Sequence, residues 1–320
     1  MNSTIPTVDL NDYINGTSEK KAAFVQALGK AYEEIGFVAV KNHGLSDELQ
    51  NKLYSSVKSF FDLEDEVKNK YDGSSNAGQR GYTAKGKEHA KGRNVGDLKE
   101  FYHVGQPLTN GRDEITKDYP DNIFPTEVPN FKEATLQTFI LLEEAGRQLL
   151  RAIATYLDLP VNYFDDKILN GNSILRPIHY FPIDDPDSIP EDAVRSAAHE
   201  DINLITLLMG ASAEGLEVLN KNNEWIAVTS VPECVVVNVG DMLQRLTNNK
   251  LCSTTHRVVN PPKEKMNTSR YSIPFFLHPK SNMSLACLEN CITSERPKAY
   301  PDATAGEYLN ERLREIGLLK

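Results

Sequence analysis

Residues 198–208 place a histidine and an aspartate two positions apart, as His199 and Asp201. The apolar residues that follow favour a buried strand, and on a strand the side chains of residues i and i+2 project from the same face. An imidazole beside a carboxylate supplies two of the three ligands of a 2-His-1-carboxylate iron site, which keeps coordination positions open for oxygen and substrate. The pair alone also fits a structural histidine that is hydrogen-bonded to a carboxylate at a strand end.

A third ligand has to come from another strand, and His256 is the candidate. It lies 55 residues after Asp201 (256 − 201), which leaves room for several strands to return to the same cavity. Arg270 and Ser272 are again two apart, and a guanidinium and a hydroxyl on one strand face form a receptor for a carboxylate. Singly, His256 fits a packed histidine and Arg270 fits half of an ion pair. Their combination with His199 favours a metal centre beside a carboxylate-binding site.

The elements that must position these residues are short strands separated by turns. From residue 173 onward the alternation and turn signals predict strands over 174–181, 199–209, 216–219, 225–228, 235–239, 254–259 and 271–277. So many closely spaced strands after a helical first half predict an α+β protein with a mainly β core. The expected core is a double-stranded β-helix, or jelly roll, flanked by helices.

The first half is expected to be rich in helices. Apolar residues at helical spacing predict helices over about 20–35, from 46 onward, and over about 131–157, with short strands at 5–10 and 37–40. Residues 72–128 have no clear periodicity and are expected to be a functional loop region or lid. A capping box from Thr304 to Glu307 starts a last helix. We expect one domain over 1–320, with a helix-rich part to about 170, a jelly roll over about 171–280 and a C-terminal helix over about 304–316.

Composition narrows the class of protein. Hydrophobic residues make up 40% and charged residues 25% of the 320 residues, as in ordinary soluble proteins. The formal net charge of −10 argues against nucleic acid or an anionic membrane as a partner. We find no membrane-spanning run and no signal peptide, and the four cysteines include no Cys-x-x-Cys pair. We expect a cytoplasmic protein, monomeric, that acts on a small molecule.

Taken together, the motifs resemble those of the 2-oxoglutarate- and iron(II)-dependent dioxygenases, in the branch that includes isopenicillin N synthase. The resemblance covers nearly the whole chain. It is carried by Ile5-Pro-x-Val-Asp-Leu10, Gly36-Phe37-x-x-Val40-x-Asn42-His43-Gly44, Arg80-Gly81-Tyr82, His199-x-Asp201, Gly240-Asp241-Met242-Leu243-x-Arg245-Leu246-Thr247-Asn248, His256-Arg-Val-Val-Asn-Pro261 and Arg270-x-Ser272. The His-x-Asp, His and Arg-x-Ser elements are specific in order and spacing, whereas the first-half motifs are individually weak.

The resemblance implies a set of ligands. Fe(II) would be held by His199, Asp201 and His256. Arg270 and Ser272 would bind the distal carboxylate of the cosubstrate 2-oxoglutarate, and Tyr180 would help to hold this cosubstrate. Tyr180 matches the second tyrosine of the family's Asn-Tyr-Tyr-Pro segment, but Ile178 stands where the family has asparagine. The expected cofactors are Fe(II), 2-oxoglutarate and O2, with ascorbate as a candidate reductant.

The resemblance also implies hydroxylation or desaturation of an unactivated C–H bond, with release of succinate and CO2. Asp201 favours a hydroxylase over a halogenase, since halogenases of this type lack that carboxylate. The alternatives are an iron oxidase of the isopenicillin N synthase type that does not use 2-oxoglutarate, and a non-catalytic jelly roll that binds a metal or ligand. Candidate substrate-pocket residues are Tyr82, Lys99, Phe101, Tyr102, His103 and Phe276.

Overall fold

The computed structural model of the chain describes residues 5–74, 78–87, 98–108, 119–183, 185, 194–210, 215–228 and 233–315. The strands are β1 Thr7–Asp9, β2 Phe37–Lys41, β3 Gly81–Thr83, β4 Lys99–Gly105, β5 Ile174–Leu175, β6 Ile178–Tyr180, β7 Ser196–His199, β8 Ile205–Met209, β9 Leu216–Leu219, β10 Trp225–Ala227, β11 Cys234–Val239, β12 His256–Val258 and β13 Arg270–Leu277. The α-helices are α1 Leu10–Ile14, α2 Ser18–Glu34, α3 Asp47–Phe61, α4 Asp65–Lys68, α5 Phe131–Tyr156, α6 Asp165–Ile168, α7 Asp241–Leu246 and α8 Ala305–Glu315. None of the helices in these ranges is both long and apolar enough to cross a membrane.

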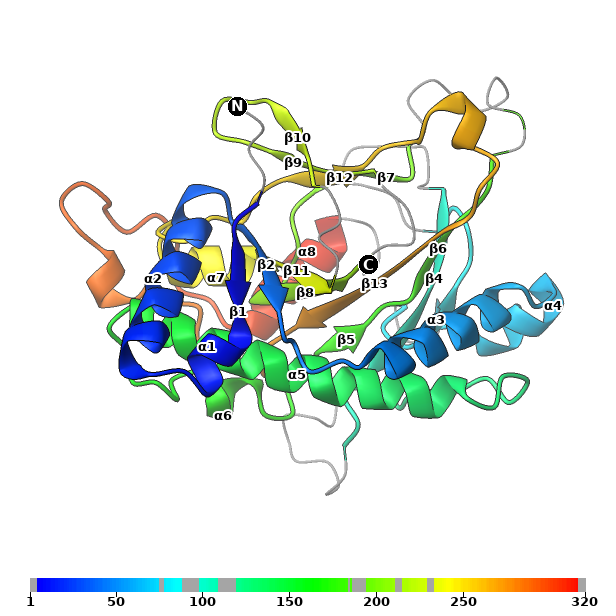
Figure 1. The fold of residues 1–320 in the computed structure, drawn as a ribbon, viewed down its shortest axis with the longest axis horizontal. Coiled ribbons are helices and arrows are strands. Elements are labelled where there is room, and N and C mark those ends of the chain that lie inside the picture. Colours follow the sequence, from blue (N-terminus) through cyan, green and yellow to red (C-terminus); the bar gives the residue numbers. More distant parts are fainter. Residues whose placement is uncertain are drawn as a thin grey trace.

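Two facing sheets form the core. In the described chain, a nine-stranded sheet has the order β1-β2-β11-β8-β13-β5-β4-β3, with β6 paired to β13 and β4. A second sheet has the order β10-β9-β12-β7. Figure 1 shows this smaller sheet lying over one face of the larger one, while α5, α3, α2 and α1 cover the opposite face. The predicted jelly roll with flanking helices is confirmed.

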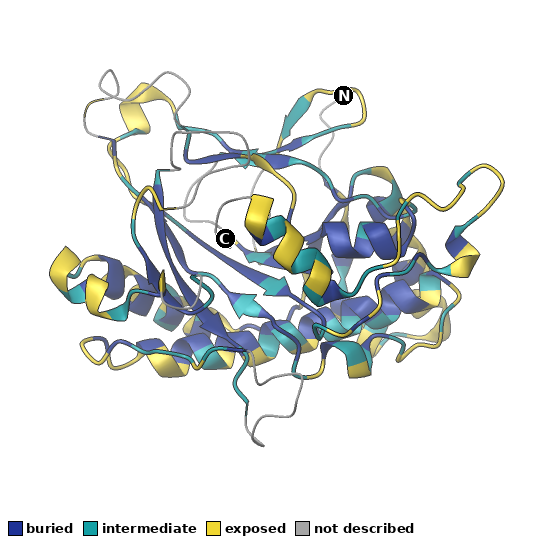
Figure 2. Cartoon of the chain, turned by 180° about the vertical axis from the view of Figure 1, so that it is seen from behind, coloured by how far each residue is buried: buried dark blue, intermediate teal, exposed yellow. Residues whose placement is uncertain are grey.

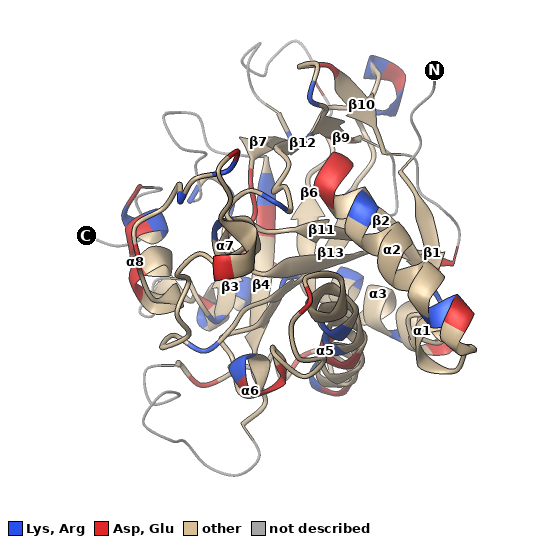
Figure 3. Cartoon of the chain, turned by 90° about the vertical axis from the view of Figure 1, so that its left-hand side faces the viewer, with Lys and Arg blue, Asp and Glu red and all other residues tan. Residues whose placement is uncertain are grey.

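Helix α5 packs along the outer face of the large sheet. Its buried residues Leu142, Leu149 and Ile153 lie at spacings that place them on one helical face. The ring of Phe139 meets that of Phe275 on β13 edge to face, with centroids 4.9 Å apart. The strands of the large sheet are mostly buried, while the outward faces of the helices are exposed and carry charged residues (Figures 2 and 3). The helices therefore cover one face of the large sheet, and its other face lines the space between the two sheets.

The expectation that residues 72–128 lack regular structure was wrong in part, because β3 and β4 lie there. β4 is buried along its whole length and pairs with β3, β5 and β6. The sequence of β4 does not suggest this burial, because the strand contains the charged residue Glu100. That carboxylate is buried but accepts hydrogen bonds from Lys68 (2.9 Å) and Tyr82 (2.5 Å), and pairs with His179 (2.8 Å). Segments 75–77, 88–97 and 109–118 of the expected lid lie outside the described residues.

The single strand expected over 199–209 is divided in two. β7 ends at His199 and β8 begins at Ile205, because the backbone between them binds the first residues of α7. The Asp241 amide donates to the Asp201 carbonyl at 2.9 Å. A side chain at Gly240 would place its Cβ 2.1 Å from Asn203 Oδ1, so only glycine permits this approach. Asp201 therefore lies in a turn rather than on a strand. The strand expected over 174–181 is likewise divided, into β5 and β6.

Helix α8 begins as its capping box predicts. The Thr304 amide and hydroxyl both donate to Glu307 Oε2 at 2.8 Å, and the Glu307 amide donates back to Thr304 Oγ1 at 3.3 Å. The Tyr308 hydroxyl donates to Asp241 Oδ2 at 2.9 Å, which ties α8 to the start of α7. The last helix therefore lies against the segment that supports Asp201.

Candidate iron centre and substrate pocket

Three predicted ligands converge at one end of the small sheet. His199, the last residue of β7, pairs directly with His256, the first residue of β12. The Nε2 atoms of His199 and His256 lie 3.8 and 3.7 Å from Asp201 Oδ1. Within the described residues, these are the three that form a possible metal site, with one ligand atom from each lying within 4.8 Å of the others. A cation with metal–ligand bonds of about 2 Å fits between atoms at this spacing.

Both imidazoles have a fixed orientation. His199 Nδ1 lies 2.8 Å from the Ala197 carbonyl and His256 Nδ1 lies 3.1 Å from the Thr254 carbonyl. A carbonyl only accepts, so each Nδ1 carries the proton and donates it, which leaves the Nε2 lone pair for a metal. Burial, together with the nearby His256, lowers the pKa of His199 to about 4, although 40% of its side chain is exposed where it faces the pocket. His199 is therefore neutral near pH 7, as a ligand must be.

Asp201 is held by two side chains behind it. Its Oδ2 accepts hydrogen bonds from Thr206 Oγ1 at 2.6 Å and Asn238 Nδ2 at 2.8 Å, while Oδ1 faces the two histidines. Burial alone would raise the pKa of this carboxyl. His256, His199 and the two hydrogen-bond donors outweigh burial and hold the pKa below its usual value. The carboxylate is thus ionised and oriented before a metal binds.

The predicted carboxylate receptor lies on β13. Arg270 pairs with Tyr180 on β6, and its guanidinium carbon lies 4.8 Å from the centroid of the Tyr180 ring. Ser272 and Phe276 follow on the same face of β13, because side chains alternate along a strand. Phe276 pairs with Thr206, which binds Asp201. Arg270 and Ser272 are both buried, and neither they nor Tyr180 line the cavity that contains His199 and Asp201.

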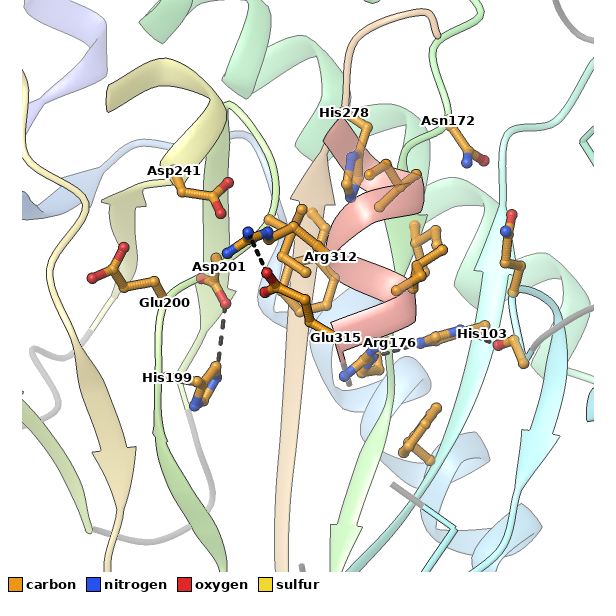
Figure 4. Close-up of a pocket in the computed structure, with 18 of the residues that line it drawn as sticks. His103, Asn172, Arg176, His199, Glu200, Asp201, Asp241, His278, Arg312 and Glu315 are labelled. Atoms are coloured by element: carbon orange, nitrogen blue, oxygen red, sulfur yellow. Dashed lines mark hydrogen bonds and ion pairs between the residues drawn. The ribbon is translucent and has the colours of Figure 1, made fainter. Parts of the chain in front are cut away.

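A cavity of about 780 Å³ opens beside this cluster and is lined by His199 and Asp201. Four of the predicted pocket residues line it, namely Lys99, Phe101, His103 and Phe276. Helix α8 closes one side of the cavity (Figure 4).

Tyr82 and Tyr102 do not line this cavity, so the prediction was wrong for them. Their rings pack against Phe60 of α3, with centroids 5.8 and 4.9 Å away, on the helix-covered face of the sheet. The error has a geometric reason. Phe101, Tyr102 and His103 are consecutive on β4, and consecutive side chains point to opposite faces.

Comparison with known proteins agrees with this geometry. A family model described as the 2OG-Fe(II) oxygenase superfamily matches residues 171–279, which contain all the candidate ligands. A second model, described as the non-haem dioxygenase in morphine synthesis N-terminal, matches residues 5–127. The chain belongs to the 2OG-Fe(II) oxygenase superfamily. The oxygenase therefore uses Fe(II), 2-oxoglutarate and O2, and the donor set of two imidazoles and one carboxylate fits this metal.

Relatives match the oxygenase over nearly its whole length. Kihadalactone A synthase LFS of Citrus sinensis is 32% identical, over 98% of this chain and 94% of the relative. A 2OG-Fe(II) oxygenase family protein from Caulobacter crescentus has 43% identity and a TM-score of 0.86, over 98% of this chain and 99% of that one. T7H of Neurospora crassa, solved with alpha-KG and thymine, has 29% identity and a TM-score of 0.86, over 97% and 96% of the two chains.

Sequence reasoning missed the two residues that hold Asp201 in place. Asn238 reads as an ordinary β-strand residue between valines, and Thr206 as part of an apolar run. The available signal was a polar side chain inside an otherwise apolar buried strand, since such a group needs a partner. Arg176, which also lines the cavity, was likewise not singled out.

Proposed function

We propose that His199 and His256 bind the Fe(II) of this oxygenase through Nε2 and Asp201 through Oδ1. The observation that carries the proposal is the convergence of three pre-oriented ligand atoms, with both Nδ1 atoms already bonded to backbone carbonyls. When bound, Fe(II) supplies the activation of O2 that couples decarboxylation of 2-oxoglutarate, to succinate and CO2, with oxidation of a substrate C–H bond.

In this proposal, the other residues of the site bind 2-oxoglutarate and exclude water. Arg270 and Ser272 hold the distal carboxylate of 2-oxoglutarate, and the ring of Tyr180 stacks on the guanidinium. Phe101 and Phe276 exclude water from the reacting end of the substrate. The carboxylate of Asp201 favours hydroxylation over halogenation.

The substrate, in the same proposal, is a small molecule. A cavity of about 780 Å³ lies in the range of ordinary small-molecule pockets and is too small for a folded polymer. Named relatives act on or bind compounds of this size: one is a proline hydroxylase, buaE of Petromyces alliaceus (33% identical), and T7H was solved with thymine. The proposal assumes a single catalytic domain over 1–320.

Anaerobic addition of Fe(II) and 2-oxoglutarate tests the assignment of residues. The wild-type protein should develop the weak visible metal-to-ligand band, and His199→Ala should abolish it by removing a ligand. Arg270→Ala should keep iron binding but raise the Kd for 2-oxoglutarate by about tenfold to hundredfold, because it removes charge-assisted hydrogen bonds.

Arg257→Ala is the matched control for Arg270. Arg257 lies on β12 of the small sheet, and its guanidinium binds Glu217 at 2.8 Å and stacks on Trp225. An unchanged band in His199→Ala would contradict the iron assignment. Turnover of substrate without succinate would instead indicate an oxidase that does not consume 2-oxoglutarate.

A further inference from the structure

His278 follows the last residue of β13 and lines the cavity beside the candidate iron centre. Side chains alternate along a strand, and Leu277 faces α5, where an added Cβ at Gly146 would lie 2.7 Å from Leu277 Cδ2. Phe276 and His278 therefore face the cavity on the other side of the sheet. His278 is only 7% exposed, and Figure 4 shows its ring pointing into the pocket.

The segment before β5 holds the backbone at His278 in place. The Ser173 hydroxyl accepts a hydrogen bond from the His278 amide at 3.1 Å and donates one to the His278 carbonyl at 3.3 Å. The Asn172 amide donates to the Pro279 carbonyl at 3.3 Å, and an added Cβ at Gly171 would lie 2.2 Å from the His278 carbonyl oxygen. His278 and Asn172 therefore lie on adjoining segments whose positions are fixed by the fold.

Both side chains carry hydrogen-bonding atoms without a partner. In the part of the chain that the structure describes, the ring nitrogens of His278 make no hydrogen bond. Asn172 also lines the cavity, is 6% exposed, and accepts a hydrogen bond from Arg80 on Oδ1 at 3.3 Å. A guanidinium only donates, so the other end of the Asn172 amide is the Nδ2 donor, for which the described residues provide no acceptor. Buried polar groups normally have partners, so the partners of these atoms must come from the contents of the cavity.

The polar surface that His278 and Asn172 present to the cavity is uncharged. Burial lowers the pKa of His278 to about 4. Asp201 offsets this effect only in part, and Arg176 and Arg80 add to it. Near pH 7 the ring therefore has one N–H donor and one acceptor nitrogen, next to the N–H donors of Asn172. A group that both donates and accepts a hydrogen bond matches this surface.

Several charged residues of the cavity already bind partners of their own. Asp72 binds Lys87 at 3.0 Å, and Glu315 of α8 binds Arg312 at 2.7 Å. A charged group in the cavity would have to compete with these pairs. An uncharged group at His278 would not.

We propose that the primary substrate carries an uncharged hydrogen-bonding group, a hydroxyl or an amide, that accepts from Asn172 Nδ2 and donates to a ring nitrogen of His278. Its reacting C–H bond then lies toward Asp201 and His199. The proposal rests on the proposed function, because it names the substrate class of the same site. An analogue that lacks this group leaves buried polar atoms unpaired, so His278 and Asn172 determine specificity without taking part in the oxidation.

Matched compounds test the proposal on the enzyme loaded with Fe(II) and 2-oxoglutarate. The panel contains lactams, cyclic imides, alkylphenols and cycloalkanols, each with its N- or O-methylated analogue, and a separate set of aromatic and aliphatic carboxylic acids. Perturbation of the anaerobic visible band reports binding, and succinate release reports turnover. At least one amide or alcohol should give both responses, with a kcat/KM about tenfold or more above that of its methylated analogue.

Variants of the two residues separate recognition from a loss of structure. His278→Leu should lower kcat/KM for the responding compound by about threefold to tenfold, mainly through KM, and leave that of the methylated analogue unchanged. It should melt close to the wild type, because the ring has no hydrogen bond to lose. His278→Gln keeps a donor and an acceptor and should restore part of the preference. Asn172→Asp keeps the acceptor for Arg80 but removes the Nδ2 donor, so it should also reduce the preference.

His43→Leu is the matched control. His43 is likewise a buried histidine whose pKa is lowered by burial, but it does not line the cavity, and its Nδ1 accepts a hydrogen bond from the Leu45 amide at 3.3 Å. Its loss should lower Tm and leave the preference between each compound and its methylated analogue unchanged.

The outcomes that overturn this proposal differ from those that overturn the proposed function. Equal use of the compounds and their methylated analogues, an unchanged preference in His278→Leu, a response confined to the carboxylic acids, or no response to any compound would each overturn it while the Fe(II)–2-oxoglutarate band persists. Absence of the band in the wild-type protein would overturn the proposed function instead.

Discussion

Asp201 uses its two carboxylate oxygens for different tasks. Oδ2 is bound by Thr206 and Asn238, and Oδ1 faces the Nε2 atoms of His199 and His256. Groups behind a metal ligand fix its direction and tune its affinity. The convergence of His199, Asp201 and His256 was predictable because the residue types and their order are specific. Their supporting residues were not, because they are recognisable only once β8 and β11 are paired.

Asn238→Leu should weaken metal binding while keeping the ligands. The substitution removes one of the two donors to Asp201 Oδ2 and replaces it with an apolar group of similar size. We expect the Kd for Fe(II) to rise by about tenfold to hundredfold, which is typical when a hydrogen bond to a metal ligand is removed. Anaerobic titration with Fe(II), or with Co(II) as a spectroscopic probe, measures the change. The metal-free variant should melt close to the wild type, and unchanged Fe(II) affinity would contradict a supporting role for Asn238.

The long helices α2, α3 and α5 were the most predictable elements, because each displays an apolar stripe of the right period, whereas the short helices α1, α4, α6 and α7 were not predicted. α5 follows its predicted range closely, and α3 begins where Ser46 caps it by accepting a hydrogen bond from the Leu49 amide. Strands β3 and β4 were the least predictable, since β3 is short and β4 owes its burial to the partners of Glu100. Polar residues inside a strand conceal it whenever their partners come from distant parts of the chain.

Glu143 makes the stability of α5 depend on pH. Burial raises its pKa to about 7, an effect that Arg147 offsets only in part. Because the folded-state pKa exceeds the ordinary value of 4.5, its contribution to stability is present below that value and is lost as pH rises through about 7. Glu143→Gln should therefore raise Tm relative to wild type at pH 8, with a difference that disappears or reverses by pH 5.

Thermal unfolding across this pH range makes the measurement. Glu144→Gln is the matched control, since Glu144 is an exposed neighbour whose carboxylate binds Arg147 at 3.2 Å. A pH-independent difference between Glu143→Gln and wild type would mean that Glu143 does not titrate in this range.

At the scale of the whole molecule, the helix-rich first half is not a separate layer from the jelly roll. β1, β2, β3 and β4 extend both ends of the large sheet, with β2 paired to β11. The sequence supports a jelly roll over 171–280 because its strands are closely spaced and regular. It does not reveal which early segments join the sheet, since strand order depends on contacts between distant residues. Phe37 of β2 even meets His256, with ring centroids 5.7 Å apart.

Gly36 tests this coupling between the two halves. It has a φ of +72°, and an added Cβ would lie 2.2 Å from the Cys252 carbonyl oxygen and 2.6 Å from Thr254 Oγ1. Gly36→Ala should destabilise the protein by about 1–3 kcal/mol through backbone strain, plus the cost of this contact. It should also weaken Fe(II) binding, because the Thr254 carbonyl orients His256.

Urea unfolding and Fe(II) titration measure the two effects. Gly44→Ala is the control, since Gly44 also has a positive φ (+87°) but no atom within 4 Å of an added Cβ. It should show the strain without the loss of metal affinity. Equal metal affinity in Gly36→Ala and Gly44→Ala would contradict the coupling.

The position of His199 on β7 has a consequence for handling the protein. Among the described strands, β7 is an edge of the small sheet and pairs only with β12. An ion shared by His199 and His256 would cross-link these two strands, so chelation would loosen that edge. Exposed strand edges recruit further chains. Protein purified with chelators should therefore aggregate sooner than iron-loaded protein, quite apart from losing its activity.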